Sequence, residues 1–280
     1  MAPVVVVTGA GGWLGRRLCI ALAASGAEVV AVSRRANEIK GCEFYRVGDY
    51  GETPAPAGAR LVHLAETASI AEAETAGEKY LETVPALLRT LLQKGYDHTV
   101  YASSGVVYGD ATALPHGIDD PVRPAGIYGR AKLAAEAQVL ASGGTVARLS
   151  NIYGPGTGRG TVVSDIVERL ACDGPLRIGN GGAVRDFLWC DDAARGLAAL
   201  ALGAIGGIVH LSTGIGTPVR HLAERALALA GQAGRPILEM DPLDRISALV
   251  LDPTATTKAC GWRAETTLDD GLSRLIGARP

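Results

Sequence analysis

The chain begins with an uninterrupted apolar run, Val4 to Val7, which ends at Thr8. A run of β-branched apolar residues is typical of a strand buried on both faces of a parallel sheet. Behind it, apolar residues recur at the spacing of a helix, at Leu14, Leu18, Ala21 and Leu22. The pattern therefore predicts a strand, a turn and a helix as the first unit of the fold.

The same alternation continues along the first half of the chain. Short apolar strands are predicted at residues 28–33, 43–47, 60–65, 99–104 and 145–149, and helical periodicity at 80–92 and 128–140. Because Pro85 falls inside the first of these helices, we expect a kink or a break near it. Strands that alternate with helices predict βαβ units, and therefore an α/β fold with a doubly wound parallel sheet.

The turn after the first strand carries three regularly spaced glycines, Gly9, Gly12 and Gly15. A turn without β-carbons lets backbone amides approach a phosphate, and the N-terminus of the following helix adds partial positive charge. The spacing is one residue longer in its first interval than the G-x-G-x-x-G dinucleotide fingerprint. A buried strand before the turn and an amphipathic helix after it favour nucleotide binding over ordinary loop punctuation.

Beyond Asn151 the regular rhythm ends, and glycine-rich loops such as GPGTGRG and GNGG separate shorter elements. We therefore expect residues 1–150 to form a dinucleotide-binding Rossmann domain, to which 183–211 return. Residues 151–182 and 212–280 are expected to form a small C-terminal substrate-binding lobe.

The end of the second predicted strand bears on the choice of cofactor. Many dinucleotide sites place an acidic residue there to bond the adenosine ribose 2′-hydroxyl, and this chain has Ser33, Arg34 and Arg35 instead. A hydroxyl and two guanidinium groups can hold a 2′-phosphate through charge-assisted bonds. The sequence therefore favours NADP(H) over NAD(H), with NAD kept as the alternative and solvated loop arginines as the simpler interpretation.

Composition narrows the class of protein further. The 280 residues are 48% hydrophobic and carry a net charge of −2, which gives no electrostatic reason to expect nucleic acid. No apolar run approaches the ~20 residues of a membrane span, and the N-terminus shows no signal-peptide pattern. The five cysteines are scattered and form no CxxC pair. We therefore expect a reduced, cytoplasmic protein without a metal site.

Three residues that could take part in acid–base chemistry lie at the end of the fifth predicted strand or in the helix after it. Ser104 ends that strand, at the edge where open parallel sheets bind ligands, and Tyr128 and Lys132 stand four apart on one face of the next helix. An ammonium beside a phenol, whose ordinary pKa is ~10, favours the phenolate and so moves the phenol toward acid–base work. A serine hydroxyl can hold the substrate oxygen while the proton moves.

In this order, these features resemble the extended short-chain dehydrogenase/reductases, and within them the sugar-nucleotide epimerase, dehydratase and reductase group. The matching stretches are TGAGGWLG at 8–15, GD at 48–49, LVHLA at 61–65, YASSGVVYG at 101–109, DDPVRPAGIYGRAK at 119–132, RLSNIYGPG at 148–156 and RDFLWCDDAARGLAAL at 185–200.

The resemblance implies a role for each matching position. The implied cofactor contacts are Gly9, Gly12, Trp13, Leu14 and Gly15 at the pyrophosphate, Asp49 and Tyr50 near the adenine, and Leu64 and Ala65 along the cofactor. Tyr128 would be the acid/base, Ser104 its hydrogen-bonding partner, and Lys132 would both tune Tyr128 and bind the nicotinamide ribose. The implied contacts to the substrate diphosphate are Asn151, Arg185 and, more loosely aligned, Arg245.

The chain departs from the family pattern at three positions and in length. Glu66 stands where the family often has a small residue, so its carboxylate either faces the sugar or points to solvent. Thr83 replaces a frequent asparagine, and Ala131 replaces a common serine. A chain of 280 residues is short for the group, which implies a trimmed substrate lobe.

Several functions fit these residues. The favoured one is an NADPH-dependent ketoreductase acting on a nucleotide sugar, and the first alternative is a 4-epimerase with the same Ser104, Tyr128 and Lys132. A 4,6-dehydratase is less favoured because no acidic pair follows Ser104. A non-catalytic NADP-sensing protein is a further alternative, although such proteins commonly lose the tyrosine or the lysine. We expect a homodimer with no nucleic-acid or membrane partner.

Overall fold

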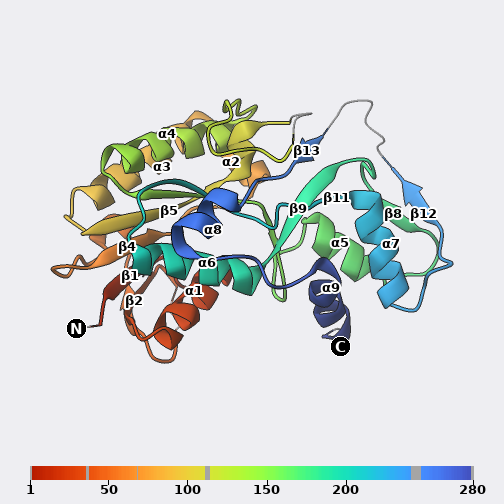
Figure 1. Cartoon of the computed structure of the whole chain (residues 1–280), viewed down its shortest axis with the longest axis horizontal. Helices are drawn as coiled ribbons and strands as arrows, with labels where there is room; N and C mark the ends of the chain where they lie inside the picture. Colours follow the sequence, from red (N-terminus) through yellow and green to blue (C-terminus); the bar gives the residue numbers. More distant parts are fainter. Residues whose placement is uncertain (1, 36–37, 68, 111–113, 241–246, 279–280) are drawn as a thin grey trace.

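In the computed structural model, which describes residues 2–35, 38–67, 69–110, 114–240 and 247–278, seven parallel strands form the main sheet. Their spatial order is β10-β6-β5-β4-β1-β2-β3 (Figure 1). They are β1 (Val4–Thr8), β2 (Glu28–Ser33), β3 (Glu43–Arg46), β4 (Arg60–His63), β5 (His98–Ser104), β6 (Thr145–Leu149) and β10 (Gly207–Leu211). The predicted doubly wound α/β fold is confirmed.

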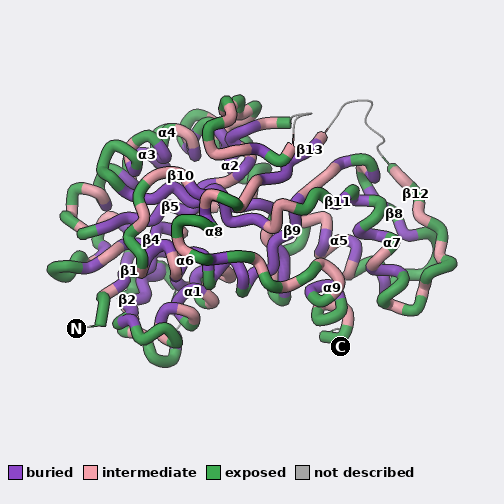
Figure 2. The backbone as a smooth tube through the Cα atoms, viewed as in Figure 1, coloured by how far each residue is buried: buried purple, intermediate pink, exposed green. Residues whose placement is uncertain are grey.

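The first strand occupies the middle of this sheet because both of its faces are apolar. Val5 and Val7 point into the cluster that contains the next helix, and Val6 points into the cluster on the opposite face. All three are completely buried, as Figure 2 shows for the central strands generally. At ~1.5–3 kcal/mol for each buried aliphatic side chain, a polar residue here would be costly on either face.

Helices cover the main sheet on both sides (Figure 1). On one side lie α1 (Trp13–Ala24) and α6 (Cys190–Gly203), which pack against each other. On the other lie α2 (Ile70–Ala76), α3 (Glu78–Leu92) and α4 (Ile127–Ala141). Two short 3₁₀ helices, η1 (Tyr50–Glu52) and η2 (Gly105–Tyr108), follow β3 and β5.

We expected a kink or a break near Pro85, and no break occurs there. Helix α3 continues through Pro85, whose side chain is among the buried residues of that helix. The interruption lies at Gly77, where φ is +59° and the backbone separates α2 from α3. Glycine adopts this conformation without a β-carbon penalty. Burial of the apolar face around Pro85, including Val84 and Leu88, keeps the helix assembled despite the missing backbone donor.

A smaller unit follows β6 and is built around β9 (Val184–Trp189). This strand pairs with β7 (Asn151–Tyr153), β11 (Gly216–Pro218) and β13 (Ala248–Leu249). A separate pair joins β8 (Leu176–Ile178) to β12 (Ile237–Glu239). The helices of this part are α5 (Val162–Arg169), α7 (Val219–Leu229), α8 (Thr254–Cys260) and α9 (Leu268–Gly277).

Strand β9 thus belongs to the smaller sheet, and the chain rejoins the main layers only at α6 and β10. Of the expected returning segment 183–211, residues 184–189 therefore pair outside the main sheet. Helix α8, placed by the sequence in the substrate lobe, contacts β10 and α6. The division into two domains stays a prediction.

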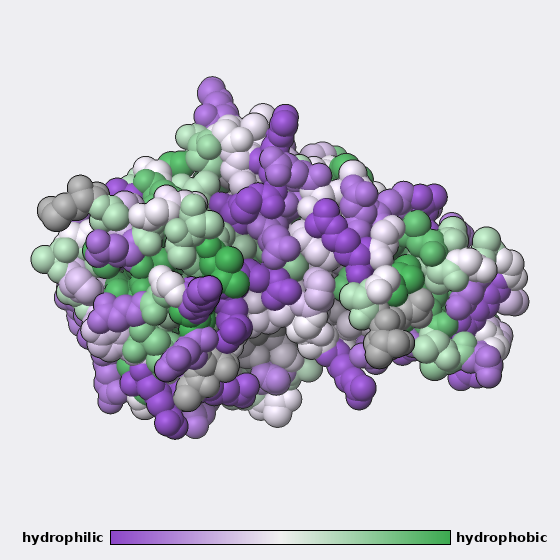
Figure 3. Space-filling view, turned by 90° about the horizontal axis from the view of Figure 1, so that it is seen from below, coloured by the Kyte–Doolittle hydropathy of each residue, from purple (hydrophilic) through white to green (hydrophobic). Residues whose placement is uncertain are grey.

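The surface shows hydrophobic side chains in separate groups among hydrophilic ones on the face of Figure 3. The large exposed apolar residues come from different elements, for example Ile20 on α1, Ile70 on α2 and Leu229 on α7. None of the described helices combines the length and apolar character needed to cross a membrane. The expected homodimer stays a prediction.

Candidate functional site

The glycine turn between β1 and α1 is held by close backbone packing. Gly9 has φ of +76°, and a β-carbon on it would lie 2.7 Å from the carbonyl oxygen of Leu64. A β-carbon on Gly15 would collide with the carbonyl oxygen of Gly9. Helix α1 starts at Trp13 after Gly12, which supplies no side-chain cap, and its first turn holds no acidic residue. These uncapped N–H groups fit the pyrophosphate of a dinucleotide.

The exit of β4 lies beside this turn. The strand ends at His63, so Leu64 and Ala65 follow it at the carboxyl edge of the sheet. The Leu64 N–H donates to the Thr8 carbonyl oxygen at 3.1 Å, which fixes the exit against the end of β1. Both residues are half-buried, and their contact with the cofactor stays a prediction.

The indole of Trp13 connects the two parts of the protein. Its Nε1 donates to the Pro155 carbonyl oxygen at 2.7 Å, and the Arg17 guanidinium donates to the same oxygen at 2.6 Å. The ring also lies 3.4 Å from the place that a β-carbon on Gly156 would take. The side chain of Trp13 is therefore engaged with the loop after β7. Leu14 packs against the core beneath the helix.

Two arginines stand at the carboxyl end of β2. Ser33 is buried and its hydroxyl accepts the Arg35 N–H at 3.2 Å. The Arg34 guanidinium lies 5.4 Å from the centre of the Tyr50 ring, and Asp49 caps the helix η1 that carries Tyr50. Arg34 and Arg35 are exposed, and neither forms an ion pair with any carboxylate in the described part of the chain. The arrangement offers two available cations and an aromatic face.

The three predicted catalytic residues come from β5 and α4. Tyr128 is 7% exposed, and the Lys132 Nζ lies 5.6 Å from the centre of its ring. The ring stacks on Tyr80 of α3, with centroids 6.5 Å apart. Ser104 ends β5, and its hydroxyl accepts the Val106 N–H at 3.3 Å, a bond that leaves the hydroxyl hydrogen free to donate. Helix η2, which Ser104 caps, packs against α4.

Lys132 has a partner that the sequence did not indicate. Its Nζ donates to Glu66 Oε2 at 2.7 Å and to the Ala102 carbonyl oxygen at 2.8 Å. Burial alone would raise the pKa of Glu66, but the Lys132 ammonium and the neighbouring His63 lower it to about 2. Burial would lower the pKa of Lys132, and the Glu66 carboxylate raises it well above its usual range. Glu66 therefore points neither to solvent nor into open space.

The expected substrate contacts lie on the smaller sheet. Asn151 is exposed at the start of β7, which pairs with β9, the strand that carries Arg185. The Arg185 guanidinium donates to the Ser247 carbonyl oxygen at 2.8 Å and to its hydroxyl at 2.7 Å. Burial lowers the pKa of Arg185, and the nearby Asp110 carboxylate opposes this effect. Arg245 lies outside the described residues.

A buried polar network supports α4 from beneath, and the sequence analysis missed it. The Glu136 carboxylate accepts the Arg148 Nη2 at 2.6 Å, and both side chains are at most 4% exposed. The Arg148 Nη1 donates to the Tyr108 hydroxyl at 2.7 Å, which lies 2.6 Å from His210 Nε2. The Ser103 hydroxyl donates to Glu136. An arginine in the otherwise apolar strand TVARL is the signal that could have revealed a buried ion pair.

Asp191 and Asp192 lie in the first turn of α6. Asp191 forms an ion pair with Arg17 at 3.2 Å. Asp192 is fully buried and accepts the backbone N–H groups of Glu265 and Thr266 at 3.1 and 2.8 Å. Besides favouring the helix N-terminus by their charge, they fasten two distant segments to α6.

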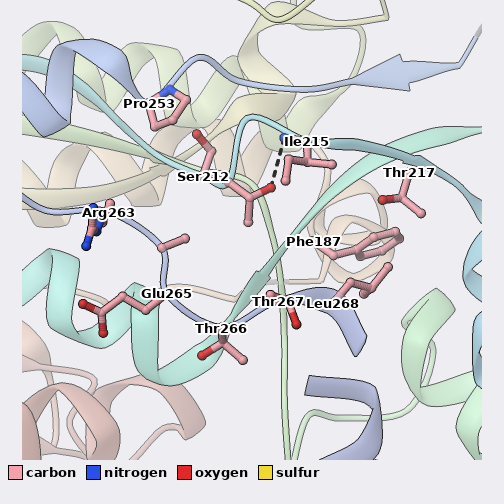
Figure 4. A pocket seen from close by; sticks show the side chains of 12 residues that line it. Phe187, Ser212, Ile215, Thr217, Pro253, Arg263, Glu265, Thr266, Thr267 and Leu268 are labelled. Atoms are coloured by element: carbon pink, nitrogen blue, oxygen red, sulfur yellow. Dashed lines mark hydrogen bonds between the residues drawn. The ribbon is translucent and has the colours of Figure 1, made fainter. Parts of the chain in front are cut away.

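A pocket of about 220 Å³ lies beside β9 and β11 (Figure 4). Its walls include Phe187 of β9, Ser212 after β10, and residues 263–268. The dashed bond in Figure 4 joins the Thr213 hydroxyl to the Ile215 N–H at 3.1 Å. None of the residues predicted for catalysis or cofactor binding lines this pocket.

Comparison with known proteins identifies a family and several relatives of this chain. A family model described as the NAD dependent epimerase/dehydratase family matches residues 5–209. A dTDP-4-dehydrorhamnose reductase from Streptomyces griseus is 29% identical over 297 residues, covering 94% of this chain and 91% of the relative. A UDP-glucose 4-epimerase from Mycolicibacterium smegmatis is 27% identical over 186 residues, covering 62% of this chain and 59% of the relative.

A solved structure, MoeE5 in complex with UDP-glucuronic acid and NAD, has a TM-score of 0.82 and 27% identity, covering 98% of this chain and 97% of that one. The chain spans under two thirds of the length of two curated UDP-glucose 4-epimerase relatives. The family match agrees with the resemblance read from the glycine turn and the Tyr128–Lys132 motif. The chain therefore belongs to the NAD dependent epimerase/dehydratase family.

Proposed function

We propose that the protein is an NADPH-dependent reductase that acts on the keto group of a nucleotide sugar. The observation that carries this proposal is the pair Arg34 and Arg35, exposed and without a carboxylate partner among the described residues, at the carboxyl end of β2. Guanidinium groups match the oxygens of a 2′-phosphate, and no acidic side chain stands there to repel it. A cofactor of this kind is suited to net reduction.

In this proposal the cofactor supplies the hydride, and the side chains handle the proton. The Ser104 hydroxyl holds the substrate oxygen, and the Tyr128 phenol gives that oxygen its proton. Among the described residues the Lys132 Nζ donates to Glu66 and Ala102, which leaves its third N–H for a ribose hydroxyl. The N-terminus of α1 holds the pyrophosphate.

The nucleotide part of the substrate is assigned to the smaller sheet. Asn151 and Arg185 stand on the paired strands β7 and β9, and an amide and a guanidinium suit a diphosphate. Relatives named as a dTDP-4-dehydrorhamnose reductase and a UDP-glucose 4-epimerase support the nucleotide-sugar class. The second of these names keeps a 4-epimerase as the alternative activity.

The test is incubation of the purified protein with a panel of nucleotide sugars and their 4-keto forms, with each of NADPH and NADH, followed by mass spectrometry. A reductase adds two hydrogen atoms to a keto substrate and consumes cofactor stoichiometrically. An epimerase instead yields an isomer of unchanged mass with cofactor in catalytic amount, which would overturn the reductase. Equally efficient turnover of a free sugar would overturn the nucleotide-sugar class.

The cofactor preference has its own test. In titration calorimetry, NADP⁺ should bind more tightly than NAD⁺, and the double variant Arg34→Ala/Arg35→Ala should lose on the order of 10–100-fold in NADP⁺ affinity because two charge-assisted contacts disappear. NAD⁺ affinity should stay nearly constant. Arg89→Ala, an exposed arginine on α3, is the matched control. Equal affinities for both cofactors in the wild type would contradict the preference.

A further inference from the structure

Glu66 places a buried carboxylate against Lys132, one of the predicted catalytic residues. It follows β4, its side chain is only 5% exposed, and its Oε2 accepts both the Lys132 ammonium at 2.7 Å and the Tyr101 hydroxyl at 3.0 Å. His63 Nε2 lies 3.5 Å from Oε1 on the other side. Two hydrogen bonds to Oε2 therefore hold the carboxylate in place, and His63 lies beside Oε1.

The ion pair with Glu66 changes the electrostatic effect of Lys132 on the Tyr128 phenol. An ammonium 4–6 Å from an ionisable group lowers the pKa of a phenol by roughly 1–3 units, and the Lys132 Nζ lies 5.6 Å from the centre of the Tyr128 ring. A carboxylate in direct contact with that ammonium cancels much of this field. The cation that should activate Tyr128 as a base is thus largely neutralised.

The other groups around Tyr128 do not replace the missing positive charge. Tyr80 stacks on the ring from α3, and Tyr101 lies on β5 beneath it. From α2, Glu74 accepts the Tyr128 backbone N–H at 3.3 Å and adds a second carboxylate. Among the described residues, Lys132 is the only cation with a recorded contact to the Tyr128 ring, and Tyr80 and Glu74 bring no positive charge.

We propose that Glu66 is a positioning residue that, by pairing with Lys132, keeps the Tyr128 phenol in the protonated form, which is the form that gives a proton to a carbonyl oxygen. This inference rests on the proposed reductase. In the reduction, the carbonyl carbon gains a hydride from the reduced nicotinamide and the electron pair of the C=O bond moves to oxygen. That oxygen takes the Tyr128 proton, and the resulting phenolate regains a proton from water.

The direct test follows ionisation of the phenol in the protein without substrate or cofactor. Tyrosinate absorbance is titrated in the wild type and in Glu66→Gln, each with its Tyr128→Phe partner, and the difference isolates one of the eight tyrosines. Burial raises the pKa of Tyr80 and of Tyr101, which separates their signals from this one. Glu66→Gln should lower the pKa of Tyr128 by about one unit or more.

Two further variants of Glu66 test whether its charge causes the shift. Glu66→Asp keeps the charge and should titrate like the wild type, whereas Glu66→Ala removes it without adding an amide and should repeat the shift if the Gln variant does not fold. Glu82→Gln, an exposed carboxylate on α3, is the control that should change nothing. An unchanged or raised pKa of Tyr128 in the charge-free variants would overturn the role of Glu66.

Kinetics give a second readout for an active preparation. In Glu66→Gln, the alkaline limb of the pH profile for reduction should move to lower pH by the same amount. Reduction with an unmoved profile would overturn the inference and leave the proposed function intact. A shifted titration without any reduction would do the reverse.

Discussion

The buried histidine of the network beneath α4 provides a quantitative prediction. His210 is fully buried on β10, with Nδ1 at 3.0 Å from the Asp252 carbonyl oxygen and Nε2 at 2.6 Å from the Tyr108 hydroxyl. A carbonyl oxygen only accepts, so Nδ1 carries a proton. The one hydrogen of the Tyr108 hydroxyl is shared between His210 Nε2 and the Gly117 carbonyl oxygen, which lies 3.0 Å away. Burial, reinforced by the Arg148 cation, lowers the pKa of His210 to about 4.

This pKa converts into a dependence of stability on pH. The unfolded chain has an ordinary histidine pKa of ~6.5, so between about pH 6.5 and about pH 4 it binds a proton that the folded protein does not. The contribution is therefore fully present above pH 6.5 and is lost as the pH falls to about 4. A difference of about 2.5 pH units, at 1.36 kcal/mol each, amounts to ~3 kcal/mol.

The assay compares urea unfolding of the wild type and His210→Gln near pH 7.5 and near pH 4. The difference in unfolding free energy between the two proteins should shrink by about 3 kcal/mol toward the lower pH, because only the wild type loses the histidine contribution. The control His221→Gln removes an exposed histidine on α7 and should show almost no such change. A difference independent of pH, or an NMR titration that places His210 at its ordinary pKa, would refute the reasoning.

Three further predictions concern the ion pair, the acid and the glycine turn. Glu136→Gln should cost ~3–5 kcal/mol of unfolding free energy, read from the urea midpoint, because it leaves the buried Arg148 without its countercharge; a loss below about 1 kcal/mol would contradict this. Tyr128→Phe should lower kcat by ~10²–10⁴ with a nearly constant melting temperature, and retention of more than about a tenth of kcat would exclude Tyr128 as the acid. Gly15→Ala should destabilise the protein by ~1–3 kcal/mol and weaken cofactor binding in calorimetry, since its methyl group meets the Gly9 carbonyl; unchanged melting and affinity would show that the turn can yield.

The main sheet could be predicted because its signals are local. The run from Val4 to Val7 has no polar position, so the strand had to be buried on both sides, and the periodic leucines behind it required a covering helix. The strand boundaries predicted at 28–33 and 145–149 coincide with β2 and β6. The position of the helix break did not follow in the same way, because tertiary packing around Pro85 outweighed its local preference.

The partners of the charged residues could not be predicted because they depend on distance in space. Glu66 and Lys132 are 66 positions apart and meet only because β4 and β5 are neighbours in the sheet. Arg185 was read as a substrate contact, and nothing in its own segment shows that Ser247 occupies its guanidinium. The motif identifies which side chains could take part in catalysis or binding. The fold decides which of them are already paired with another residue of the protein.

The strand order of the two sheets also has a consequence for synthesis of the chain. In the main sheet, β2 and β3 extend one side of β1, and β4, β5, β6 and β10 extend the other in sequence order, so each new strand can join an edge already formed. The smaller sheet is different, because β9 receives β13 only after residue 249 has been made. Domains fold as units during translation, with N-terminal parts first. The main sheet can therefore be assembled on the ribosome before the sheet that carries Arg185 is complete.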